Sequence, residues 1–159
     1  MSDCIVKTLS GGLEFTFSLA NKFVEVCPDD VWGKKFGGWP VWQQLFHPFA
    51  SIDFFLRPQE APPSPSPFAE GVAELKVSPE TAPDKKTVLE FMAGAQARVF
   101  AYAMTLDDAA LALVNEGPSA RMGREMTHAG VLALIGSHTM YHLGACDAAL
   151  REHGIPGVF

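Results

Sequence analysis

Apolar residues recur at intervals of three and four along most of this chain, and this periodicity limits it to a helical fold. A first helix is expected over residues 9–26, because one of its faces carries Leu13, Phe17, Ala20 and Val24. A second helix is expected over residues 40–56, with Pro40 in its first turn. Polar residues are so sparse in this second segment that it should be buried on most sides.

Two further helices are predicted in the second half of the chain. Asp84 is a suitable N-cap for the third helix, whose apolar stripe consists of Val88, Met92, Ala95, Val99, Tyr102 and Leu106. Residues 107–114 are expected to add a short helix, and residues 115–118 a turn. The last helix is then predicted from Ser119 or Met122 to His153, with Gly154 as its C-terminal stop.

A proline-rich segment separates the second and third helices. Seven of the twelve prolines lie between Arg57 and Pro83, so helix is excluded through most of this stretch. Residues 72–77 are compatible with either a short strand or a helical turn, and residues 32–38 with a glycine-rich loop. The sequence therefore predicts an all-α fold: a single-domain four-helix bundle over residues 1–159, with a long proline-rich crossover between helices 2 and 3. We expect residues 58–83 to run near the mouth of a pocket.

Composition narrows the location and partners of the chain. A net charge of −6 argues against nucleic acid or an anionic membrane surface as the main partner. Residues 126–146 lack Asp, Glu, Lys and Arg, but three histidines, three glycines and several hydroxyl side chains within them indicate a core helix rather than a membrane span. Three scattered cysteines and no visible targeting signal predict a reducing, cytoplasmic location.

The last predicted helix carries histidines on its inward stripe. This stripe consists of His128, Val131, Ile135, His138, His142, Ala145 and Ala149. His138 and His142 are one turn apart, and two imidazoles at this spacing can bind one divalent metal ion. The alternative is that both are core histidines satisfied by hydrogen bonds. His47 lies in a similarly apolar setting on the second helix and can in principle complete a set of three.

Other metal-site types fit the sequence poorly. A zincin protease requires Glu directly after its first histidine, where this chain has Thr139. A di-iron carboxylate bundle requires two Glu-x-x-His motifs, and only Glu125–His128 provides one. His128 is about 15 Å along the helix from His138, so we expect it to be a buried or packing residue.

Several neighbouring side chains have less certain roles. Cys146 is expected to be a small buried hydrophobe, with thiolate ligation as the alternative. Tyr141 is compatible either with core packing or with a hydrogen bond to a substrate. Asp53 is considered as a partner that orients a histidine, although it lies about 240° around the helix from His47. His153 is expected to interact with the helix dipole.

The chain resembles the DinB-like (YfiT-related) family of four-helix bundles. The resemblance rests on Trp42-Gln43-Gln44-Leu45-Phe46-His47, on Ser137-His138-Thr139-Met140-Tyr141-His142-Leu143-Gly144 and on Leu150-Arg151-Glu152-His153-Gly154. It implies a metal site formed by His47, His138 and His142, one histidine from the second helix and two from the last. Ala145 departs from the family, whose members often have Gln at this position.

The resemblance also implies a function. Three histidines leave coordination positions open, which is typical of a catalytic rather than a structural site, and the ligand set favours Zn²⁺ or Ni²⁺, with Fe²⁺ and Mn²⁺ as alternatives. The family includes thiol transferases, hydrolases and isomerases. We therefore expect a metal-dependent thiol S-transferase acting on a small-molecule substrate with a low-molecular-weight thiol, although no catalytic residue is assigned. The alternatives are a metal-dependent hydrolase and a non-catalytic bundle that binds a small ligand or protein; a homodimer is also expected.

Overall fold

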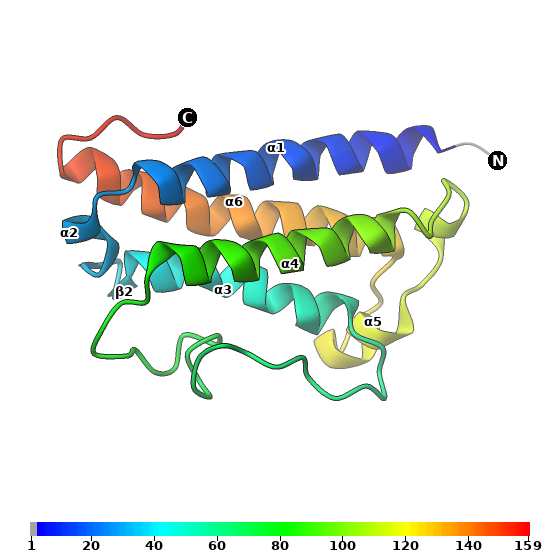
Figure 1. Cartoon of the computed structure of the whole chain (residues 1–159). Helices are drawn as coiled ribbons and strands as arrows, with labels where there is room; N and C mark the ends of the chain where they lie inside the picture. The colour runs from blue at the N-terminus through cyan, green and yellow to red at the C-terminus, as the bar shows by residue number, and fades with distance from the viewer. Residues whose placement is uncertain (1–2) are drawn as a thin grey trace.

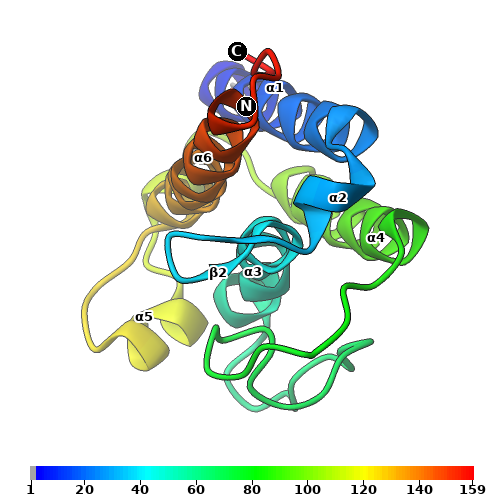
Figure 2. The ribbon, with the colours of Figure 1, turned by 90° about the vertical axis from the view of Figure 1, so that its left-hand side faces the viewer.

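Four long helices form the bundle. The computed structural model describes residues 3–159, and the long helices are α1 (Cys4–Val26), α3 (Val41–Leu56), α4 (Lys85–Ala103) and α6 (His128–Glu152). Seen end-on, they form a ring in the order α1, α6, α3, α4 (Figure 2). This arrangement confirms the predicted four-helix bundle with its long crossover between the second and third long helices.

The short elements close the ends of the bundle. The α2 helix (Asp29–Trp32) follows α1, and a two-stranded antiparallel hairpin, β1 (Lys35–Phe36) and β2 (Trp39–Pro40), leads into α3. Beyond α4 lie the 3₁₀ helix η1 (Ala110–Ala112) and α5 (Glu116–Met122). Within residues 3–159, no helix combines the length and the apolar content needed to span a bilayer.

The crossover makes α3 and α4 run in the same direction (Figure 1). Residues 57–84 return from the end of α3 to the start of α4 and contain only turns and irregular structure, including residues 72–77. Gln43, fully buried in α3, donates from Nε2 to the carbonyls of Val72 (2.9 Å) and Val77 (2.6 Å). The crossover is therefore fixed to the bundle at this point.

The core lies along the bundle axis and is rich in aromatic side chains. Phe17 of α1 contacts Phe49 of α3 and Phe100 of α4, with ring centroids 5.5 and 5.8 Å apart. Trp42 and Phe46 pack against Phe68 of the crossover at 5.1 and 4.8 Å. The crossover thus contributes to the core as well as to the surface.

The predicted start of the last helix is wrong. Residues 119–122 belong to α5, and the chain breaks at Gly123, whose φ of 64° is in the left-handed region that favours glycine. The predicted turn at 115–118 is instead the start of α5, where Pro118 occupies the first turn. The α6 helix begins at His128, capped by the Thr127 hydroxyl, which accepts from the Gly130 N–H at 3.1 Å.

Other boundaries are closer to expectation. The α1 helix begins at Cys4 rather than near Leu9, because the Asp108 carboxylate accepts from the N–H groups of its first residues, Cys4, Ile5 and Val6. Asp84 caps α4 as predicted, accepting from the Thr87 N–H at 2.8 Å. Gly154, with φ of 74°, follows the end of α6.

Candidate metal centre

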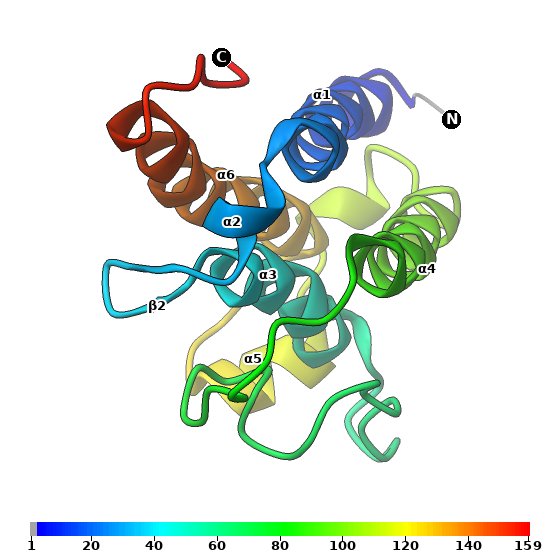
Figure 3. The same cartoon turned by 60° about the vertical axis from the view of Figure 1, so that its left-hand side comes forward.

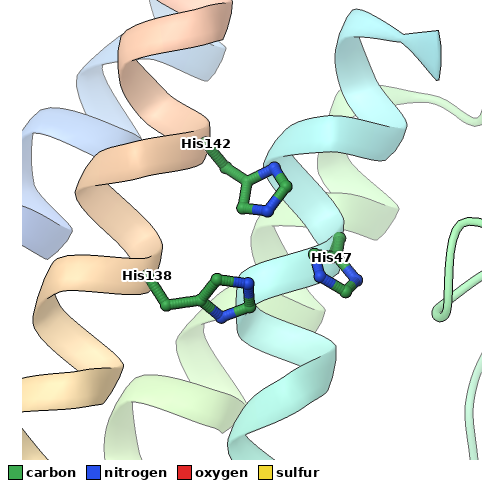
Figure 4. A group of neighbouring side chains, drawn as sticks. All are labelled: His47, His138 and His142. Atoms are coloured by element: carbon green, nitrogen blue, oxygen red, sulfur yellow. The ribbon is translucent and has the colours of Figure 1, made fainter. Parts of the chain in front are cut away.

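Three histidines from two helices converge on one point. His138 and His142 extend from consecutive turns of α6 towards α3, where His47 lies (Figure 4). The three ring centroids form an almost equilateral triangle, 4.9 Å for His47–His138, 4.7 Å for His47–His142 and 4.9 Å for His138–His142. One ring nitrogen from each histidine lies within 4.8 Å of the other two.

The protonation of these histidines suits a metal ligand. Burial, followed by repulsion from His47, lowers the pKa of His138 from its usual 6.5 to about 4. The same causes, with a further contribution from His138, lower the pKa of His142 to about 4. Both rings are therefore neutral at pH 7, as coordination requires.

A backbone carbonyl of the crossover orients His47. Its Nδ1 lies 2.6 Å from the carbonyl oxygen of Ala73, which only accepts, so Nδ1 carries the proton and donates. In the neutral ring Nε2 then has a free lone pair. Metal-binding histidines are commonly held in this way by a carbonyl on the second nitrogen.

The other two histidines have unsatisfied nitrogens. Among residues 3–159, the Nδ1 atoms of His138 and His142 are buried and lack a hydrogen-bond partner. Leaving a buried polar atom unpaired costs about 1–3 kcal/mol. Ligand atoms on a tetrahedral ion with bonds of about 2.1 Å lie about 3.4 Å apart, so shifts of less than about an ångström per ring would close the three onto one ion. The donor set therefore fits a divalent transition metal.

Three other side chains that the sequence analysis considered near the histidines, those of Asp53, Cys146 and His128, have different partners in the structure. Asp53, which the sequence offered only weakly as a partner for a histidine, instead accepts from the Ser64 hydroxyl and lies 3.8 Å from Arg57. Cys146 is fully buried and its Sγ faces the carbonyl of Val41 at 3.6 Å, as expected for a small core residue. His128 contacts the Tyr102 hydroxyl at the far end of α6, consistent with a packing role.

Two further residues of α6, Tyr141 and His153, lie at the surface. Tyr141 is 75% exposed, which rules out core packing, and its ring lies 5.2 Å from that of His142. His153 is exposed and its Nδ1 lies 2.8 Å from the carbonyl of Ala149 in the last turn of α6, as a partner of the helix dipole would.

The buried face of α6 is rotated slightly from the face that the sequence predicted. Its fully or nearly fully buried members are Val131, Leu132, Ile135, Thr139, Leu143, Cys146, Ala149 and Leu150. His142 is 8% exposed and His138 is half-buried, so the histidines lie at the edge of the core rather than at its centre. This position leaves the triangle reachable from outside the bundle.

Sequence reasoning missed the residues that hold the site in place. Gln43 and the carbonyl of Ala73 fix the crossover against His47, but a carbonyl contact across 26 residues leaves no pattern in the sequence. Gln43 carried the one available signal, because a fully buried amide in an apolar helix requires specific partners.

Comparisons with known proteins agree with this architecture. No curated protein matches the chain in sequence. A crystal structure of a DinB-like protein from Bacillus cereus ATCC 10987 superposes with a TM-score of 0.68 and 18% identity, covering 96% of this chain and 97% of that one. The sequence profile described as the DinB superfamily matches residues 13–146. A bundle of this topology, matched by that profile over most of its length, belongs to the DinB superfamily.

Proposed function

We propose that His47, His138 and His142 hold a divalent transition metal and that the protein is a metal-dependent thiol S-transferase. The observation that carries this proposal is the triangle of imidazoles, two of which have buried nitrogens that lack a hydrogen-bond partner among residues 3–159. Three neutral ligands leave the charge of the ion uncompensated and leave a coordination position open. Zn²⁺ or Ni²⁺ suits this ligand set best.

A bound divalent ion would supply Lewis acidity, which lowers the pKa of a coordinated thiol or water. The reaction we propose forms a bond between the thiol sulfur and an electrophilic carbon. The bond from that carbon to its leaving group breaks, the leaving group departs with the electron pair, and the thiol proton passes to the leaving group or to solvent. Among residues 3–159, no carboxylate belongs to the histidine cluster, and this favours a thiol, which needs no strong general base, over water as the nucleophile.

The chain's own residues orient and isolate the site. Ala73 fixes the tautomer of His47, and the ring of Phe55, 6.1 Å from that of His138, supplies an apolar wall. Tyr141 projects into solvent beside His142, where its hydroxyl is available to an incoming molecule.

Metal content tests the first part of the proposal. Elemental mass spectrometry of the untagged protein should find about one transition-metal ion per chain. His47→Ala and His138→Ala should each lose it. His153→Ala is the matched control, because this histidine is exposed at the end of α6 and should leave the metal content unchanged. Absence of metal from the wild type, even after incubation with Zn²⁺ or Ni²⁺, would leave a non-catalytic binding bundle.

Turnover tests the second part. The metal-loaded protein is mixed with a panel of low-molecular-weight thiols and 1-chloro-2,4-dinitrobenzene, and chloride release is followed. We expect turnover that is lost in His138→Ala and retained in His153→Ala. Ester or amide hydrolysis without thiol transfer would instead identify a hydrolase.

A further inference from the structure

A pocket of about 500 Å³ lies between α3, α4 and the proline-rich crossover. His47 lines it, so the pocket adjoins the histidine triangle, and residues 63–66 of the crossover form part of its wall. Figure 3 shows the crossover passing beneath α3 and α4. This volume is typical of sites for small organic molecules.

Arg57, at the end of α3, lines the same pocket and is short of hydrogen-bond acceptors. Its side chain is 17% exposed, and its Nε and Nη1 are buried without a hydrogen-bond partner among residues 3–159. The ion-pair contact to Asp53 is 3.8 Å from Nε, too long for a hydrogen bond. A guanidinium stays charged at every physiological pH, so these nitrogens are costly unless an acceptor reaches them.

The guanidinium of the neighbouring Arg121, in contrast, has hydrogen-bond acceptors. Its Nε donates to the carbonyl of Phe54 at 2.7 Å and its Nη2 to that of Arg57 at 2.6 Å. Arg121 therefore joins α5 to the end of α3. Arg57 has no equivalent structural task, although Arg98 of α4 adds a second positive charge to the pocket lining.

The charges around the pocket favour a single carboxylate over a phosphate. Asp53, Glu74 and Glu90 line it together with the two arginines, so a dianion would be repelled. A carboxylate matches the fork of one guanidinium, formed by Nη2 together with either Nε or Nη1, through two parallel hydrogen bonds. The acidic side chains suit a ligand that also carries an amine.

The length of the pocket sets the size of the ligand. Arg57 directly follows α3 and is ten residues from His47 along the chain, which corresponds to about 15 Å along the helix axis. The reach of the arginine side chain shortens this span. An extended peptide advances about 3.3–3.6 Å per residue, so a molecule of about two or three amino-acid residues fits between the two ends.

We propose that this pocket binds a short-peptide-like carboxylic acid, with its carboxylate on Arg57 and its opposite end at His47. That this molecule is the substrate rests on the proposed function; that it binds here does not. Arg57 is then a binding residue for the end of the ligand remote from the histidines.

Ligand-observed NMR tests the proposal with amino acids, dipeptides and tripeptides, each as the free acid and as the C-terminal amide. We expect at least one acid to bind the wild type roughly tenfold or more tightly than its amide. Arg57→Gln should remove this preference, because hydrogen bonds to a charged group are worth about 1.5–3 kcal/mol, or tenfold and more in affinity. Arg124→Gln is the control, since this arginine is exposed outside the pocket lining and should leave the preference intact.

Further measurements separate this proposal from the metal site. The preference for acids should persist in metal-free His138→Ala, and Arg57→Gln should retain the metal content of the wild type. The melting temperature of ligand-free Arg57→Gln should not fall, because the substitution removes unsatisfied buried donors. No acid preference in the wild type, or a preference that survives in Arg57→Gln, would overturn the proposal.

Discussion

The buried imidazoles of His138 and His142 make the stability of the metal-free protein depend on pH. Each has a native pKa of about 4, below the 6.5 expected when the chain is unfolded. Between these values the unfolded state binds more protons than the native state. The free energy of unfolding should therefore be greatest above pH 6.5, fall as the pH drops towards about 4, and level off below it.

Urea denaturation of the chelator-treated protein at a series of pH values measures this dependence. His138→Gln removes one of the two groups and should flatten the curve between pH 6.5 and 4. An equally steep curve in this variant would show that the dependence comes from other groups.

The three cysteines should differ sharply in reactivity. Burial raises the pKa of Cys27 to about 11 and also raises that of Cys146, while Cys4 is exposed. Because the thiolate is the reactive form, iodoacetamide at pH 8 should label Cys4 in the folded protein and the other two only after unfolding. Mass spectrometry after digestion identifies the labelled residues. Rapid labelling of Cys146 in the folded protein would contradict its assignment to the core.

At the scale of the helix, the start of α6 depends on a single side chain. The Thr127 hydroxyl accepts from the Gly130 N–H, and Thr127→Ala should lower the free energy of unfolding by about 1 kcal/mol. Thr127→Ser keeps the oxygen and should recover most of this loss. Urea denaturation compares the two variants. Equal destabilisation by alanine and serine would assign the effect to the lost methyl group rather than to the cap.

The long helices could be predicted because each has an apolar stripe or a capping residue that the sequence displays directly. Asp84 and Gly154 mark two helix ends in this way. The break at Gly123 was also signalled by the glycine, but the last helix was predicted to run through this residue. The sequence did not determine which face of α6 is buried, because apolar residues occur on several of its sides. Only packing against α3 selects the buried face.

The histidines of the site could be predicted from the sequence, whereas the residues around them could not. The spacing of His138 and His142 placed both on one face of a helix, and the family resemblance added His47; the structure brings all three together. Arg57 and Ala73 had no sequence signal, because their roles depend on where the crossover lies. A segment without periodic structure leaves its contacts undetermined until the fold is known.

At the scale of the molecule, the aromatic core joins three helices through Phe17. This residue is 2% exposed and contacts both Phe49 and Phe100. Phe17→Ala should lower the free energy of unfolding by about 3–5 kcal/mol, because it leaves a cavity between α1, α3 and α4. Phe15, on the same helix but 61% exposed, is the matched control, and Phe15→Ala should change stability by less than about 0.5 kcal/mol. Thermal or urea unfolding compares the two; similar losses would contradict this description of the core.

Substitutions in the proline-rich crossover and substitutions in the helices should have different consequences for this protein. The histidines and the aromatic core belong to helices, whereas residues 63–66 line the pocket from an exposed segment. Substitutions in these four residues can reshape the pocket without disturbing the packing of the bundle. A gene that diversified only there would produce proteins with the same three histidines and different preferences for small molecules, so ligand selectivity can evolve in this scaffold at almost no cost to folding.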